Sequence, residues 1–114
     1  LLGVFDELSS SEPLPVTILR QRLLVMALDE QIWPFLAIWL EVAARAARQD
    51  PFYLSVGEQI GRGFLEWVRS QLASASLQER DAEALQLFAL IEGAVLLKSV
   101  GLVSELRQSL GAGG

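Results

Sequence analysis

The sequence contains no cysteine and no histidine, and its 114 residues include a single lysine, Lys98. Without cysteine no disulfide framework can form. Without histidine the chain lacks the commonest metal ligand and the usual general base, so a serine nucleophile would depend on Lys98 alone. No spacing of residues is typical of a metal site. We therefore expect no enzyme activity, no catalytic residue, no metal site and no cofactor.

Positive charge is also scarce, and the net charge is −5. The nine basic residues are spread evenly along the chain. Surfaces that bind nucleic acid instead gather lysine and arginine into a patch. This segment is therefore not expected to bind DNA by itself.

Long uncharged runs are missing as well. The most apolar stretch, residues 84–102, is interrupted by Gln86, Glu92 and Lys98. A bilayer span needs about 20 largely uncharged residues, so we expect a buried helix and no membrane partner. Apolar residues make up 52% of the chain and charged residues 20%, which is typical of a globular domain with its own core.

Apolar residues recur at spacings of three and four, and no stretch alternates with period two for long. The pattern predicts an all-α fold, a helical bundle of about five helices in a single domain over residues 1–114. Proline and serine predict a loop at 9–15, and a second loop is expected at 74–81. The expected helices are 15–28, 34–48, 51–73 and 81–102, with a shorter tail to 110.

Aspartate and proline mark the expected helix boundaries. Asp50 should be an N-cap and Pro51 the first residue of the helix that follows. Trp33 precedes Pro34 and is therefore expected outside the α region, with Pro34 in the first turn of the next helix.

The helix expected over 34–48 has one narrow polar stripe. Glu41 and Arg45 lie four residues apart in the favourable order, a pair that contributes about 0.3 kcal/mol. The rest of this helix is apolar, so we expect neighbours to cover it on most sides.

The two ends of the chain predict a fragment. Residues 1–8 are apolar in helical register from the first position and begin without methionine, which suggests the end of a linker helix. Ser9 and Glu12 have the spacing of a capping box. Residues 111–114, with three glycines, are expected to form a flexible tail.

An apolar pocket is one interpretation of the aromatic residues and Met26 on the middle helices, because ligand cavities are lined mostly by such side chains. The alternative is an ordinary core. Glu92 lies in an apolar helix, and a buried carboxylate needs a partner. That partner could be a hydroxyl, an arginine or solvent, or else a ligand or a dimer seam. The predicted pocket residues are Leu19, Leu23, Met26, Trp33, Phe35, Trp39, Ala43, Tyr53, Phe64 and Glu92.

The stretch "LAIWLEVAARAARQDPFY", residues 36–53, resembles the regulatory domain of TetR-family transcriptional regulators, where Asp-Pro ends one helix and opens the next. "FLEWVRSQL" in the following helix agrees with that order, as does an acidic residue followed by glycine in the last long helix. The family often has Asp-Gly where this chain has Glu92-Gly93. The helix-turn-helix segment that reads DNA in the family is absent.

The resemblance implies a cytoplasmic bacterial repressor domain that binds a small apolar or aromatic effector and homodimerises. DNA would be bound only through the absent N-terminal domain, and effector binding would lower its DNA affinity. The helices over 51–73 and 81–102 would pair with their twins as a four-helix bundle. An apolar last helix and two glycines one turn apart fit such packing. The predicted interface residues are Gly57, Gly61, Val68, Leu72, Leu85, Phe88, Val95, Leu96 and Leu102.

Two alternatives remain open at this point. One is a free-standing helical dimer that binds or carries a hydrophobic small molecule. The other is an adaptor-type helical dimer without a ligand, in which the aromatic side chains only fill the core.

Overall fold

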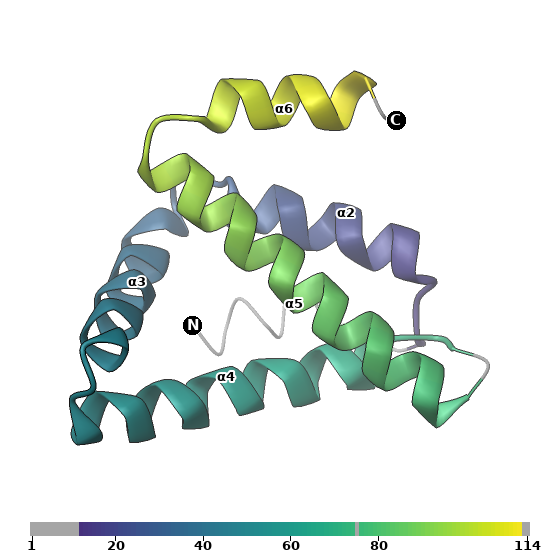
Figure 1. Ribbon diagram of the computed structural model, residues 1–114. Helices are drawn as coiled ribbons and strands as arrows, with labels where there is room; N and C mark the ends of the chain where they lie inside the picture. Colours follow the sequence, from purple (N-terminus) through teal and green to yellow (C-terminus); the bar gives the residue numbers. More distant parts are fainter. Residues whose placement is uncertain (1–11, 75, 113–114) are drawn as a thin grey trace.

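The computed structural model describes residues 12–74 and 76–112, and over these the chain is built from helices (Figure 1). The described part contains no strand, only an isolated bridge between Leu14 and Leu72. The all-α prediction is confirmed. The helices are α2 (Val16–Ala27), α3 (Trp33–Ala47), α4 (Pro51–Gln71), α5 (Leu77–Ser99) and α6 (Val103–Ala112).

The boundary between α3 and α4 follows the prediction. The Asp50 carboxylate accepts hydrogen bonds from the backbone N–H groups of Phe52, at 3.0 Å, and Tyr53, at 3.4 Å. Pro51 is the first residue of α4, where its missing N–H costs nothing. The predicted pair of Glu41 and Arg45 is also present, with Nε and Oε1 2.9 Å apart.

The predicted loop over 74–81 was too long, because α5 already begins at Leu77. The Ser76 hydroxyl accepts a hydrogen bond of 3.1 Å from the backbone N–H of Glu79 and so caps the helix. The sequence carries the signal for this start, since serine followed three residues later by glutamate is a capping-box pattern.

α5 also ends before the predicted residue 102. Gly101 has a φ of +85°, Leu102 N–H donates to the Leu97 carbonyl, and Gly101 N–H donates to the Lys98 carbonyl. These two bonds form a Schellman motif, which stops α5 and turns the chain into α6. α6 includes Gly111 and Ala112, which were predicted to belong to a flexible tail.

Trp33 was predicted outside the α region, and this is wrong, because it is the first residue of α3. Its N–H donates to the Asp29 carbonyl at 3.1 Å. Pro34 is then the second helical residue, where its lack of an N–H again leaves no helical bond unmade.

The core lies where α2 and α4 pack against α5. Leu19 and Leu23 of α2 and Val95 of α5 are fully buried, and Val68 of α4 joins them. Two backbone hydrogen bonds hold Leu14 beside the end of α4, to the Gln71 carbonyl at 2.7 Å and from the Ala73 N–H at 2.8 Å.

α3 is less covered than its sequence predicts. Figure 1 shows α3, α4 and α5 as the sides of an open triangle, and α3 packs mainly on α4. A Cβ added at Gly57 would lie 3.7 Å from Val42 and 3.9 Å from Ala46, so this glycine lets the two helices approach. No residue of α3 is buried. Within the described part of the chain, neighbouring helices therefore do not cover α3 on most sides, contrary to the prediction.

Three predictions concern residues that the structure does not describe, or describes only in part. The linker helix over residues 1–8 lies outside the described residues, as does Ser9 of the predicted capping box. Residues 113–114 of the predicted tail lie outside them too. No helix in the described ranges is long and apolar enough to cross a bilayer.

Candidate functional site

The most unusual polar contact of the fold joins α3 to α5. The indole Nε1 of Trp39 donates a hydrogen bond of 2.6 Å to Oε2 of Glu92, a half-buried carboxylate. Burial raises the pKa of the Glu92 carboxyl above its ordinary value, and the hydrogen bond from Trp39 opposes that rise. Among the described residues no lysine or arginine forms an ion pair with Glu92. Its partner is thus an indole, which is neither the hydroxyl nor the arginine considered from sequence.

A second polar contact lies nearer the end of α5. The Lys98 ammonium is 2.9 Å from the Glu30 carboxylate and 4.7 Å from the centroid of the Trp33 ring. It also donates to the carbonyl of Leu28, the C-cap residue of α2, at 3.4 Å. The Lys98 side chain is only 9% exposed. A cation here is stabilised by a carboxylate, a ring face and the negative end of a helix.

These two contacts define a strip that we call the α3–α5 seam. Trp33 and Trp39 lie six residues apart on α3, and their partners Lys98 and Glu92 lie six apart on α5 in reverse order, so the helices run antiparallel there. Phe35 lies one turn before Trp39 on α3 and is exposed. Backbone packing between α3 and α5 is sparse, in contrast to that between α3 and α4. The long side chains of the two contacts therefore join α3 and α5 where backbone packing is sparse.

On its other side the Trp39 ring borders a groove between α3 and α4. The groove has a volume of about 490 Å³ and is open to the surface. Three alanines of α3 contribute to its lining, together with the polar side chains of Gln49 and Glu58. Its lining residues are Trp39, Ala43, Ala46, Ala47, Gln49, Leu54, Gly57 and Glu58.

The predicted pocket residues occupy several different places. Trp33, Trp39 and Glu92 belong to the seam, Ala43 lines the groove with Trp39, and Phe35 is exposed. The remaining five do not join them, because they pack elsewhere. Leu19, Leu23 and Met26 are buried in the core, Phe64 contacts Trp67 and Phe88, and Tyr53 contacts Phe52 and the Arg45 guanidinium.

The predicted interface list combines two different stripes of the helices. Val68, Leu72 and Val95 are buried within the chain itself, so they leave no side-chain surface for a partner, and their assignment to an interface is corrected. Gly57 and Gly61 also serve packing inside the chain, since each lies against its own α3 or α5. A Cβ at Gly61 would lie 3.7 Å from the Phe88 ring.

Of the other predicted interface residues, Phe88 is half-buried against Phe64, whereas Leu85, Leu96 and Leu102 are exposed. Leu85 is 59% exposed and Leu96 55%, on the side of α5 that faces away from the core, and Leu102 is exposed after the helix. Val100 is 62% exposed and was not among the predicted interface residues. Its helical spacing of four from Leu96 could have placed it on the same face.

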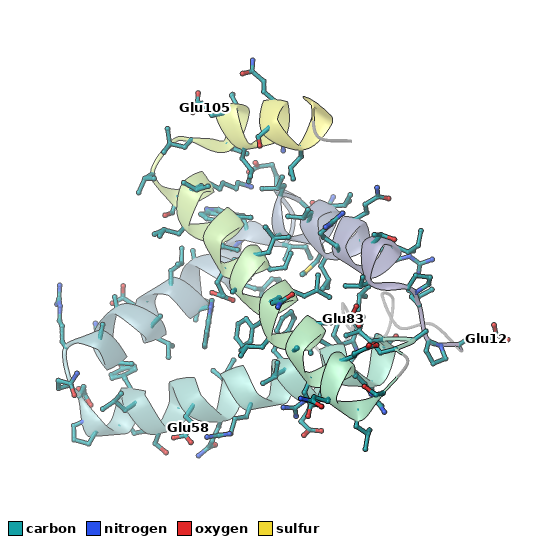
Figure 2. The ribbon with its side chains drawn as sticks, turned by 45° about the vertical axis from the view of Figure 1, so that its right-hand side comes forward. Glu12, Glu58, Glu83 and Glu105 are labelled. Atoms are coloured by element: carbon teal, nitrogen blue, oxygen red, sulfur yellow. The ribbon has the colours of Figure 1, made fainter. Side chains whose placement is uncertain are left out.

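The acidic residues that the structure describes do not form a site of their own. Figure 2 labels Glu12, Glu58, Glu83 and Glu105, which lie well apart on the molecule. Glu83 accepts a hydrogen bond of 2.5 Å from the Ser74 hydroxyl. In the part of the chain that the structure describes, no group of three acidic residues is arranged to hold a metal ion.

Comparison with known proteins returned no relative. No family model, no curated protein and no solved structure matches this chain. The likeness to TetR-family regulators therefore rests on the order of residues and motifs in this sequence.

Proposed function

We propose that this chain is the small-molecule-sensing, homodimerising regulatory domain of a TetR-like transcriptional repressor. The observation that carries the proposal is the exposed apolar face of α5. Leu85, Ala89, Leu96 and Val100 are exposed and fall within about 60° of one another around the helix axis. None of these four is charged, and Glu92 lies at the edge of the face, about 20° from Leu85 around the helix axis.

Such a face is costly to leave in water. Burial of an exposed leucine contributes about 1.5–3 kcal/mol, and exposed apolar patches mark interaction sites. The opposite side of α5 already packs on α2 and α4, where Ile91 and Val95 are buried. A second copy that offers the same face would cover both, as the isologous interface of a twofold dimer does. This supports α5 as the centre of the dimer interface.

The sensing part of the proposal is supported by the α3–α5 seam. An effector that enters there and displaces the Trp39–Glu92 contact would change how α3 sits on α5. Effector binding is coupled to DNA affinity when the two arrangements of the domain differ in affinity for the effector. The DNA-binding segment belongs to a part of the repressor outside this sequence.

Native mass spectrometry of Leu96→Glu tests the interface. A charge placed in the centre of the apolar face should convert the dimer to a monomer, because burial of an unpaired carboxylate costs several kcal/mol. Val25→Glu is the matched control, since Val25 is an exposed apolar residue on α2. The control variant should remain dimeric.

A monomeric wild-type chain, or a Leu96→Glu variant that stays dimeric, would contradict this interface. A dimer that retains a small adduct would support the sensing part as well. A longer gene product that dimerises and holds such an adduct without binding DNA would instead favour a free-standing carrier of hydrophobic molecules.

A further inference from the structure

We propose that α5 packs antiparallel on α5 of a second copy, with Glu92 against Glu92, and that the two carboxylates share one proton in the dimer. This inference rests on the proposed dimerising function and names the geometry and the regulation of its interface. The proton comes from solvent when two chains associate, so a fall in pH favours the dimer.

The exposed apolar face of α5 is symmetric along the helix. Leu85 and Val100 lie at equal distances from the point between residues 92 and 93. Ala89 and Leu96 lie closer to that point and are equally symmetric about it. In an antiparallel packing with its twofold axis at this point, each leucine meets the smaller member of its own pair on the second copy. A parallel packing would set each leucine against itself and leave alanine opposite alanine.

The antiparallel packing also brings Glu92 next to its own copy. Glu92 lies at the level of the twofold axis and at the edge of the apolar face. A residue at that level stays on the same side of the interface under the twofold rotation, so the two Glu92 side chains face each other. Gly93 lies at the same level on the opposite edge. A Cβ added there would meet nothing within 4 Å of the single chain, and its absence lets the two backbones approach.

Two facing carboxylates are costly when both are ionised. Like charges that share a site strongly raise the pKa of one of the two groups, and the loss of water at an interface acts in the same direction. Burial already raises the pKa of Glu92 in the single chain. One shared proton removes one of the two charges and forms a short hydrogen bond between the carboxyl and the carboxylate.

Glu92 has one oxygen available for this bond. Oε2 accepts the hydrogen bond of 2.6 Å from the Trp39 indole, whereas Oε1 accepts none from a described residue. The carbonyl oxygen of a protonated carboxyl also accepts a hydrogen bond. The contact with Trp39 is therefore kept in both protonation states, and Oε1 is the atom that faces the second copy.

No described ionic group compensates the charge of Glu92. Trp39, which faces it from α3, does not titrate, and the other charged residues of α5 before Glu92, within 79–83, lie more than two turns away. The charged side chains of the neighbouring helices, and Lys98 of α5, are exposed or paired with one another. They are Arg20 and Arg22 on α2, Glu41 with Arg45 on α3, Glu58 with Arg62 and Glu66 with Arg69 on α4, and Lys98 with Glu30.

Sedimentation equilibrium of the purified chain at several pH values tests the shared proton. The pKa of the pair is higher in the dimer than in the free chain, so the gain in association is fully present below the pKa of the free chain. It is lost as pH rises through the pKa of the dimer. The dissociation constant should therefore increase between about pH 5 and about pH 8, by up to about tenfold per pH unit for one proton per dimer. Salt at about 0.5 M screens the general repulsion between chains of net charge −5.

Glu92→Gln should remove most of this pH dependence and tighten the dimer at about pH 8. Glutamine still accepts the bond from Trp39 but carries no charge. Glu105→Gln, an exposed glutamate of α6, is the matched control and should keep the pH dependence of the wild type. A pH dependence that survives in Glu92→Gln would overturn the inference.

Cysteine cross-linking tests the antiparallel packing separately, because the chain has no cysteine of its own. Glu92→Cys should form a disulfide-linked dimer on oxidation, since the two copies of this residue face each other. Leu77→Cys should not, because antiparallel packing sets the two starts of α5 far apart. A disulfide in Leu77→Cys without one in Glu92→Cys would indicate parallel packing and overturn the inference.

The same measurements separate this inference from the proposed function. A wild-type dimer with one dissociation constant from about pH 5 to about pH 8 would overturn the shared proton and leave the dimerising function intact. A chain that sediments as a monomer at every pH would contradict the dimerising function, and the inference with it.

Discussion

Trp39 of α3 reaches Glu92 of α5 across 53 positions of sequence, and its indole N–H lies 2.6 Å from the carboxylate oxygen. α3 otherwise packs mainly on α4, so this contact links α3 to the helix at the centre of the core. Two polar side-chain contacts, at Glu92 and at Lys98, therefore link α3 to α5, in addition to the apolar packing of Leu36 and Leu40 on the core.

Glu92→Gln is expected to stabilise the fold near neutral pH. Burial raises the pKa of Glu92 above its ordinary 4.5, so the folded state binds this proton more tightly than the unfolded state. The contribution of Glu92 to stability is then fully present below the unfolded pKa and is lost as pH rises through the folded pKa. The neutral variant escapes that loss.

Urea denaturation at several pH values measures the difference. The variant should exceed the wild type at pH 7, and the two curves should converge below about pH 4.5. The charged groups nearby have partners of their own, Lys98 with Glu30 and Arg45 with Glu41. A wild type that is the more stable protein at pH 7 would show that the bond to Trp39 outweighs the cost of burial.

Two glycines should respond to alanine with opposite signs. Gly101 has a φ of +85°, where a Cβ is strained, so Gly101→Ala should lower the free energy of unfolding by about 1 kcal/mol. Gly63 lies inside α4, and a Cβ there would meet nothing within 4 Å. Gly63→Ala should raise stability by up to about 1 kcal/mol. Thermal denaturation of both variants checks the signs, and two shifts in the same direction would contradict the helix-end geometry.

Gln49 is a second residue with a positive φ at a helix end, where glycine should increase stability. It has a φ of +70° at the end of α3, where Asp50 N–H donates to the Arg45 carbonyl and Gln49 N–H to the Ala46 carbonyl. This is the same motif that Gly101 forms after α5. Gln49→Gly should therefore stabilise the protein by about 1 kcal/mol, measured by chemical denaturation. Arg48→Gly, one residue earlier, should destabilise it and serves as the control.

Lys98→Met should destabilise the fold by about 1–2 kcal/mol. Methionine keeps most of the apolar stem but removes the charge from the Trp33 ring and the donor from the Leu28 carbonyl. Arg107→Met, an exposed residue of α6, should change stability by less than about 0.5 kcal/mol. Equal effects of the two substitutions in urea denaturation would mean that the buried lysine contributes no more than a surface charge.

Local signals explain what the sequence predicted well. Asp50 and Pro51 determine a helix start through bonds within three residues, so the boundary between α3 and α4 could be read directly. The start of α5 followed an equally local rule at Ser76, which the sequence analysis overlooked. Both helix starts can therefore be predicted without knowing how the helices cross in the fold.

The contacts of the candidate site, by contrast, depend on how the helices cross one another. α5 is apolar both toward the core, as at Val95, and away from it, as at Leu96, so its sequence alone does not show which stripe meets α2. The interface list consequently combined both stripes. Glu92 was singled out from the sequence, but its partner Trp39 follows from the antiparallel run of α3 along α5, which no local pattern encodes.

The presence of a single lysine, almost wholly covered, gives the molecule a built-in kinetic reporter. An amine-reactive reagent can modify Lys98 only when its ammonium leaves Glu30 and the Trp33 ring. The rate of that modification would measure how often the end of α5 separates from the turn between α2 and α3. No label needs to be introduced to observe this motion in the native chain.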